Sequence, residues 1–85
     1  MRIELLSAAE KDFADLSREI QERVTKKLDH YRQAPSPLAF AKRLRDDPEG
    51  THRFEVAGDW RAKFNIENGM IWITRIRHRS NAYRR

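Results

Sequence analysis

The hydrophobic period changes once along this 85-residue chain, close to Gly50. Before that point, apolar residues recur three or four positions apart: Phe13, Leu16, Ile20, Val24, Leu28 and Tyr31. This spacing predicts one long amphipathic helix. After it, apolar and charged residues alternate, as they do along half-buried β-strands. A chain with its helices and strands in separate segments is expected to form an α+β fold.

Short signals complete the expected order of elements. Residues 3–5 alternate between apolar and charged side chains and predict a strand. Ser7 followed by Glu10 has the form of a capping box, so the long helix is expected to begin there and to end before Pro35. A second start signal, a serine followed by a proline, predicts a short helix up to about residue 44.

The segment after Gly50 predicts three antiparallel strands. A tight turn at residues 57–59 separates the first two, and Asn68-Gly69 is a strong hairpin signal before the third, from residue 70 to about 77. The predicted architecture is an N-terminal strand followed by two helices, long then short. The helices cover one face of an antiparallel sheet that the three-stranded meander completes. All of this is expected within a single domain over residues 1–85.

Composition narrows the class of protein. The chain has no cysteine, which excludes disulfides, thiolate metal ligands and cysteine nucleophiles and suits a reducing compartment. The first residues lack the apolar stretch of a signal peptide, and no apolar run is long enough to span a bilayer. A cytoplasmic location without membrane association is therefore expected.

Positive charge is concentrated in the last 35 residues. Residues 1–50 hold ten basic and ten acidic residues, whereas residues 51–85 hold eight basic against three acidic, which accounts for the net charge of +5. A segregated positive field is typical of proteins that bind nucleic acid, because contacts with phosphates release counterions. RNA is the expected partner, and a surface that is basic only for solubility is the alternative.

Strand parity predicts where these charges lie. If the helices cover the apolar positions (Phe54, Val56, Ala62, Phe64 and Ile66), the open face receives Arg53, Arg61 and Lys63. On the last strand, Arg75, Arg77 and Arg79 share their parity with Ile71 and Ile73, so alternation alone does not decide their face. Should they join the others, five arginines and a lysine converge on one surface.

No familiar catalytic motif occurs in the chain. There is no nucleophile-elbow serine and no phosphate-binding glycine loop, and the three histidines are too scattered to be read as metal ligands. The acidic residues at 46–49 are interpreted as an Asp-Pro turn rather than a metal site. A site must then be built from Arg, Lys, Tyr and His, which suffices for metal-free RNA cleavage because the ribose 2′-OH supplies the nucleophile.

Two stretches match a known family: HRFEVAGDWRAKF (residues 52–64) and ITRIRHRSNAYRR (residues 73–85). With the order of elements, they resemble the RelE/ParE superfamily of toxins from type II toxin–antitoxin systems, over nearly the whole chain. The shared motifs are the hairpin turn Gly58-Asp59-Trp60-Arg61 and an ending with His78-Arg79 and Tyr83. The resemblance implies a toxin that needs no cofactor and is held inactive by a cognate antitoxin.

The resemblance also implies roles for single residues. Arg61 and Arg79 match family arginines that stabilise the phosphate, Arg79 being also a proposed general acid, and Tyr83 matches the tyrosine proposed as the base on the 2′-OH. His78 titrates in the right range to be an alternative acid or base. The remaining cations of the open face are expected to bind RNA: Arg53, Lys63, Arg75 and Arg77.

The activity implied by the resemblance has three alternatives. The main expectation is a RelE-like, metal-independent endoribonuclease that cuts mRNA on the ribosome. The second is a ParE-like inhibitor of DNA gyrase without hydrolytic chemistry, and the third is an inactive relative that represses DNA together with its antitoxin. Glu55 stands where RelE has the second of two lysines, Arg53 standing for the first, and this departure leaves room for the latter two.

Overall fold

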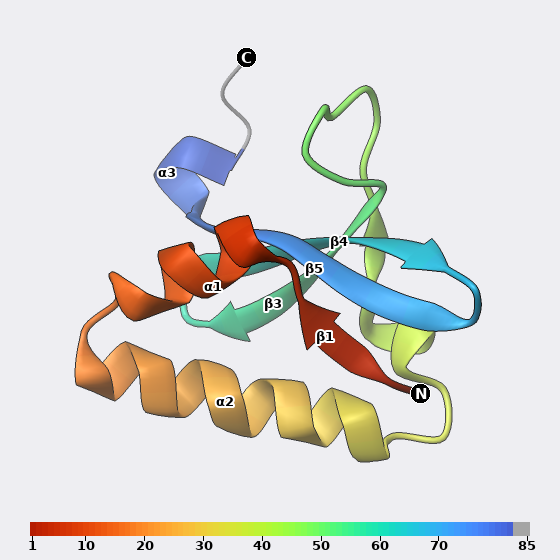
Figure 1. Cartoon of the computed structure of the whole chain (residues 1–85), viewed down its shortest axis with the longest axis horizontal. Coiled ribbons are helices and arrows are strands. Elements are labelled where there is room, and N and C mark those ends of the chain that lie inside the picture. Colours follow the sequence, from red (N-terminus) through yellow and green to blue (C-terminus); the bar gives the residue numbers. More distant parts are fainter. Residues whose placement is uncertain (83–85) are drawn as a thin grey trace.

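The structure is a computed structural model, and it describes residues 1–82 (Figure 1). Its elements follow in this order: β1 (Ile3–Leu5), α1 (Ser7–Ala14), α2 (Arg18–Gln33), the 3₁₀-helix η1 (Pro37–Phe40), β2 (Lys42–Arg43), β3 (His52–Ala57), β4 (Trp60–Glu67), β5 (Met70–His78) and α3 (Arg79–Ala82). Within residues 1–82, no helix has the length and apolar character needed to cross a membrane. The predicted α+β class is confirmed.

The five strands form one sheet in the order β1-β5-β4-β3-β2. The meander of β3, β4 and β5 is antiparallel, as predicted, and Asn68 and Gly69 at its second turn both have positive φ, as a type I′ turn requires. β1 was expected to join an antiparallel sheet, but it lies parallel to β5, with Ile3 beside Ile71. The two-residue strand β2, which no sequence signal predicted, pairs with the start of β3.

The predicted long helix is divided into two. α1 ends at Ala14, and Ser17 caps α2 by accepting a hydrogen bond from the amide of Ile20 at 3.3 Å. Ser7, the expected cap, is instead the first residue of α1 and caps nothing with its side chain. The apolar stripe continues from α1 into α2 with the same spacing, so the sequence periodicity gave no sign of the break between the two helices. The expected second helix is reduced to the single 3₁₀ turn η1.

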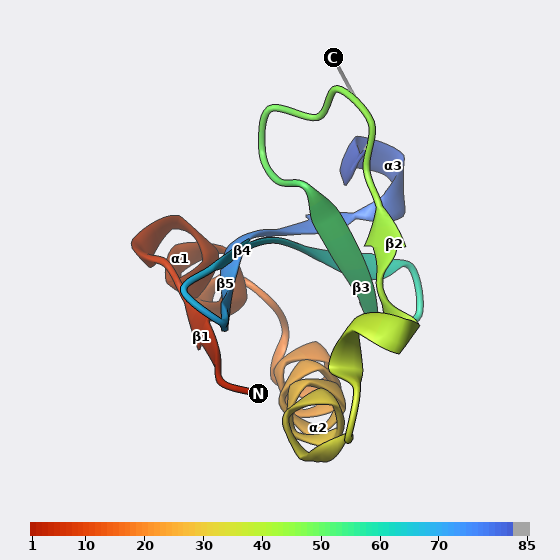
Figure 2. The same ribbon diagram turned by 90° about the vertical axis from the view of Figure 1, so that its right-hand side faces the viewer.

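The core lies between the sheet and α2. Figure 2 shows α2 end-on, below the sheet. Aromatic rings stack in a row from α2 into the sheet, with centroids 4.2 Å apart between Tyr31 and Phe54 and 4.5 Å apart between Phe54 and Phe64. The positions expected to face the helices are buried, with one exception. Ile66, near the end of β4, is 39% exposed. The fully buried large side chains are Phe54, Phe64, Ile3, Ile71, Ile73 and Val24.

A β-bulge in β5 resolves the parity that alternation left open. Lys63 pairs with Arg75, but the next residue, Phe64, pairs with Ile73, so Thr74 is the extra residue. Because the bulge shifts the phase by one, Ile73 faces the core while Arg75 faces the opposite side. The Thr74 hydroxyl stabilises the bulge, because its single proton can be donated to the carbonyl of Glu49 or to that of Lys63, which is 3.1 Å away.

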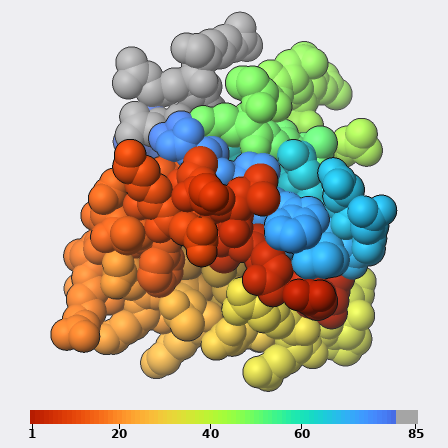
Figure 3. All heavy atoms as spheres, in the orientation of Figure 1, coloured from red at the N-terminus to blue at the C-terminus, as the bar shows by residue number. Residues whose placement is uncertain are grey.

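The space-filling view separates the molecule into two parts (Figure 3). α2, in orange and yellow, occupies its lower part, and α1, in red and orange, lies above α2. The segment of residues 44–51 between β2 and β3, which we call the acidic loop, projects in green at the top. Figures 1 and 2 both place this loop on the side of the sheet away from α2. The acidic loop therefore lies over the face that was expected to be bare.

Candidate functional site

Two rows of charged side chains cross the sheet on the face away from α2, which we call the charged face. The register aligns Arg53, Lys63 and Arg75 in one row and Glu55, Arg61 and Arg77 in the next. The structure thus brings five of the predicted cations onto one face. Like charges directly opposite one another in a sheet repel, so this face needs counter-ions.

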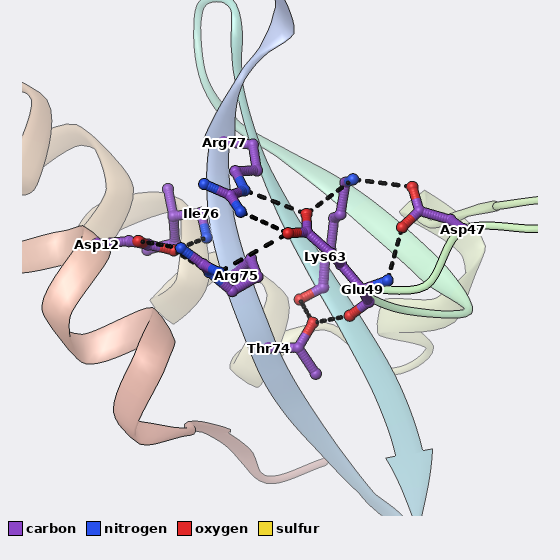
Figure 4. Close-up of polar contacts among 8 residues, drawn as sticks. All are labelled: Asp12, Asp47, Glu49, Lys63, Thr74, Arg75, Ile76 and Arg77. Atoms are coloured by element: carbon purple, nitrogen blue, oxygen red, sulfur yellow. Dashed lines mark hydrogen bonds and ion pairs between the residues drawn. The ribbon is translucent and has the colours of Figure 1, made fainter. Parts of the chain in front are cut away.

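The acidic loop supplies two of these counter-ions (Figure 4). Lys63 donates from Nζ to Asp47 Oδ2 at 2.8 Å and to Glu49 Oε1 at 3.1 Å. Arg77 donates from Nε to Glu49 Oε1 at 3.1 Å and from Nη2 to the other oxygen, so its planar fork holds the carboxylate with two bonds. Arg75 Nη1 lies 3.7 Å from Glu49 Oε2. Glu49 therefore contacts three cations from two strands.

Helix α1 supplies the third counter-ion. Asp12 accepts from Arg75 Nε at 2.8 Å and from Nη2 at 3.0 Å, and it also accepts from the backbone amide of Ile76 at 2.9 Å. β1 ends before it reaches Ile76, so Asp12 takes the place of a strand partner at this edge. Three cations and three carboxylates then balance within the protein: Lys63, Arg75 and Arg77 against Asp12, Asp47 and Glu49.

The pKa values follow from these contacts. The hydrogen bond from Arg77, aided by Lys63, lowers the pKa of Glu49 to about 2 in spite of partial burial. Burial raises the pKa of Asp12, but the bonds from Arg75 and the Ile76 amide outweigh it, and the net pKa is lowered. Hydrogen bonds to Glu49 and Asp12 raise the pKa of Arg77 and Arg75, respectively. All four groups are consequently ionised at neutral pH.

The acidic loop is held in place by contacts that do not involve the Glu49 carboxylate. The amide of Leu44 donates to the carbonyl of Thr51 at 2.9 Å and closes the loop at its base. The amide of Glu49 donates to Asp47 Oδ1 at 2.8 Å. Gly50 is buried so closely against Phe64 that a Cβ would lie 3.1 Å from the Phe64 amide nitrogen and carbonyl oxygen. Glu49 is therefore presented to the charged face by a fixed backbone.

Arg61, the predicted phosphate-binding residue, is only 8% exposed. Its Nη1 donates to the carbonyls of Gly58 at 2.9 Å and Trp60 at 3.3 Å, and its Nη2 lies 3.8 Å from Glu55 Oε2. The guanidinium thus folds back over the β3–β4 turn and stabilises it. Lys63, predicted to bind RNA, is 2% exposed and is enclosed by its two carboxylates.

The remaining predicted site residues are dispersed. His78 lies in register with Trp60, which alternation places on the face opposite Arg77, and its Nδ1 is 3.0 Å from Ser80 Oγ. Arg79 was expected to continue the strand, but it begins α3 and its side chain is exposed. Arg53 is half-buried on the charged face. Tyr83 lies outside the described residues.

The carboxylates that neutralise the charged face are the residues that sequence reasoning missed. Asp47 and Glu49 were interpreted only as members of a turn, and Asp12 only as a favourable charge near a helix start. Asp47, Glu49 and Asp12 lie 16, 28 and 63 residues, respectively, from the cations that they contact most closely. The one available signal was that an acidic cluster directly precedes strands rich in basic residues.

A second surface lies along α2 and the end of β3. A groove of about 460 Å³ is lined by Arg23, Lys26, Lys27, Glu55, Val56, Ala57 and Gly58. We call it the basic groove, because three exposed cations of α2 form one wall and Glu55 is its single acidic residue. Unlike the charged face, it presents its cations to solvent.

Comparison with known proteins places the chain in a family. Residues 3–83 match the model of the ParE toxin of the type II toxin-antitoxin system parDE. No curated protein sequence matches. The toxin–antitoxin complex RelBE2 from Mycobacterium tuberculosis has a similar structure, with a TM-score of 0.72 and 26% identity over 92% of this chain and 96% of that one.

The RelE–RelB complex from the archaeon Pyrococcus horikoshii OT3 is similar in fold, with a TM-score of 0.69 and 20% identity over 95% of this chain and 97% of that one. Both similarities extend over more than nine-tenths of each chain. The family match spans all the described elements. The chain therefore belongs to the ParE toxin family, within the RelE/ParE superfamily of type II toxin–antitoxin systems.

Proposed function

We propose that this toxin binds DNA gyrase and inhibits it without cutting RNA. The observation that carries the proposal is the neutralised charged face. Cleavage of RNA without a metal needs fixed positive charge directed at the phosphate, and here Lys63, Arg75 and Arg77 direct theirs at Glu49, Asp47 and Asp12. The match to the ParE family model supports the same proposal.

A RelE-like ribonuclease is the second candidate. The similarity to the toxin of the Mycobacterium tuberculosis complex and the exposed Arg79 beside His78 favour it. It would require Arg61 to leave the β3–β4 turn, where its guanidinium makes two hydrogen bonds to carbonyls. It would also require Glu49 to leave three cations. Both changes break charge-assisted contacts. Inhibition of gyrase requires neither change, so we favour it over the ribonuclease.

A cognate antitoxin is the second partner that we propose. The two solved relatives are toxin–antitoxin complexes, which supports an equivalent complex for this chain. An acidic antitoxin segment would complement the basic groove, whose exposed lysines and arginine steer association with negatively charged partners.

One paired experiment tests the proposal. Purified toxin is added to a gyrase supercoiling reaction and, at the same concentration, to a translating extract. We expect supercoiling to be lost while the message stays uncut. Toxin that has been mixed with its antitoxin is the matched control and should leave supercoiling intact. Cut message with normal supercoiling would contradict the proposal and favour the ribonuclease.

A further inference from the structure

We propose that Glu49 occupies, from within the chain, a binding site for a phosphate group of nucleic acid. On this proposal the charged face is a phosphate site whose ligand is replaced by a carboxylate of the acidic loop. Glu49 would then be the residue that excludes RNA from the sheet. The proposal concerns the charged face alone and does not depend on which target the toxin inhibits.

The geometry around Glu49 is that of an anion site. Arg77 presents two nitrogens of its planar fork to the two carboxylate oxygens, Lys63 adds a third donor at 3.1 Å, and Arg75 lies 3.7 Å away. Figure 4 shows these groups converging on Glu49 from β4 and β5. A phosphate is also an anion, and two of its oxygens can accept both arms of the arginine fork, so the same donors suit it.

Glu49 holds this place against dissolved anions because it is tethered. The loop backbone fixes it by bonds from the Glu49 amide to Asp47 and from the Thr74 hydroxyl to the Glu49 carbonyl. A tethered ligand acts at a high effective concentration, which a dissolved anion must match before it can compete for the same donors. Lys63, at 2% exposure, contacts both Asp47, at 2.8 Å, and Glu49, at 3.1 Å.

Removing the carboxylate should therefore reveal the site without removing the loop. Glu49→Gln keeps the size of the side chain and all backbone contacts of the loop, and it leaves three cations against two carboxylates. Glu67→Gln is the matched control, because it makes the same change of charge at an exposed position at the end of β4.

The first test measures binding of a fluorescein-labelled single-stranded RNA oligonucleotide by anisotropy over a range of salt. We expect Glu49→Gln to bind at least about tenfold more tightly than wild type or Glu67→Gln. The dependence of log affinity on log salt should steepen by about one, as for one additional phosphate contact. Equal affinity of Glu49→Gln and Glu67→Gln would overturn the proposal.

A second measurement covers the case in which Glu49→Gln folds poorly because its cations repel. The melting temperature of Glu49→Gln and of Glu49→Ala is followed while inorganic phosphate replaces chloride at constant ionic strength. We expect phosphate to raise the melting temperature of both variants by several degrees relative to its effect on wild type and Glu67→Gln. No selective rise in either variant would overturn the proposal.

The two proposals fail in different ways. If wild type cuts message and leaves gyrase unaffected, the proposed function is wrong, yet the comparison of Glu49→Gln with Glu67→Gln still decides the role of Glu49. If gyrase is inhibited but Glu49→Gln gains no affinity for RNA or phosphate, only the inference about Glu49 is wrong.

Discussion

The two faces of the sheet are buried by different means. Toward α2, aromatic and aliphatic side chains pack against Val24, Leu28 and Tyr31. On the charged face, ion pairs with the acidic loop and α1 satisfy groups that would otherwise repel. Packing responds to lost volume, whereas an ion-paired cluster responds to lost charge balance. The two faces should therefore differ in how they react to substitution and to pH.

The largest effect is expected on the apolar face. Phe54→Ala removes the central ring of the stack between Tyr31 and Phe64 and should lower the free energy of unfolding by about 4 kcal/mol. Ile66→Ala, on the same face but 39% exposed, should cost roughly 1 kcal/mol or less. Urea unfolding of both variants measures the difference, and similar losses would show that the core does not centre on Phe54.

A slightly smaller effect is expected at the centre of the charged face. Lys63→Met removes the shared partner of Asp47 and Glu49 and should cost about 3 kcal/mol, because two partly buried carboxylates lose a donor. Lys42→Met, an exposed lysine on β2, should change the free energy of unfolding by less than about 0.5 kcal/mol. A loss at Lys63 no greater than that at Lys42 would contradict the pairing.

The two faces should also differ in how their contribution to stability changes with pH. The pKa of Glu49 is about 2 in the folded protein against 4.5 in the unfolded chain. Glu49 thus binds a proton less readily in the folded state than in the unfolded state. Its contribution to the free energy of unfolding is therefore fully present above pH 4.5 and is lost as pH falls through 2. The loss is roughly 3 kcal/mol at most, and the lowered pKa of Asp12 adds to it in the same direction.

The measurement is the free energy of unfolding of wild type and Glu49→Gln from pH 6 to about 2. Wild type should lose stability more steeply than the variant, because glutamine does not titrate. Phe54→Ala serves as the control, since its pH dependence should parallel that of wild type. Parallel curves for wild type and Glu49→Gln would mean that Glu49 is not held as an anion.

The smallest effect on stability is expected in the basic groove. Lys26→Glu should change the free energy of unfolding by less than about 0.5 kcal/mol, because the side chain is exposed. It should nevertheless weaken antitoxin binding about tenfold at low salt, through a slower association rate. Lys11→Glu, on α1 away from the groove, is the matched control for surface plasmon resonance. If Lys26→Glu and Lys11→Glu weaken antitoxin binding equally, the basic groove is not part of the interface.

Much of the fold was predictable because its signals are local. The alternation after Gly50 and the Asn68-Gly69 turn fix the meander without reference to distant residues. The break between α1 and α2 was missed because Ser17 has Ile20, not an acid, three positions later, so it carries no capping-box signal. Ser7 and Glu10 carry that signal where it is not used.

The site was less predictable because it depends on distant contacts. Alternation could not place Arg75 and Arg77, since a single bulged residue, Thr74, decides their face. Glu49 and Asp12 reach these arginines from 28 and 63 residues away in the chain. The sequence shows that the last two strands carry cations, but only the folded chain shows that carboxylates form ion pairs with these cations.

The most direct test of the neutralised charged face is the pKa of Glu49 itself. Glutamate labelled with ¹³C at the carboxyl carbon, with the Glu49 signal assigned by its absence from Glu49→Gln, can be followed by NMR as the folded protein is acidified. A midpoint near pH 2 is predicted, because Arg77 and Lys63 hold the ionised form. A midpoint near 4.5 would show a carboxylate free in solvent and would contradict the internal occupation of the charged face.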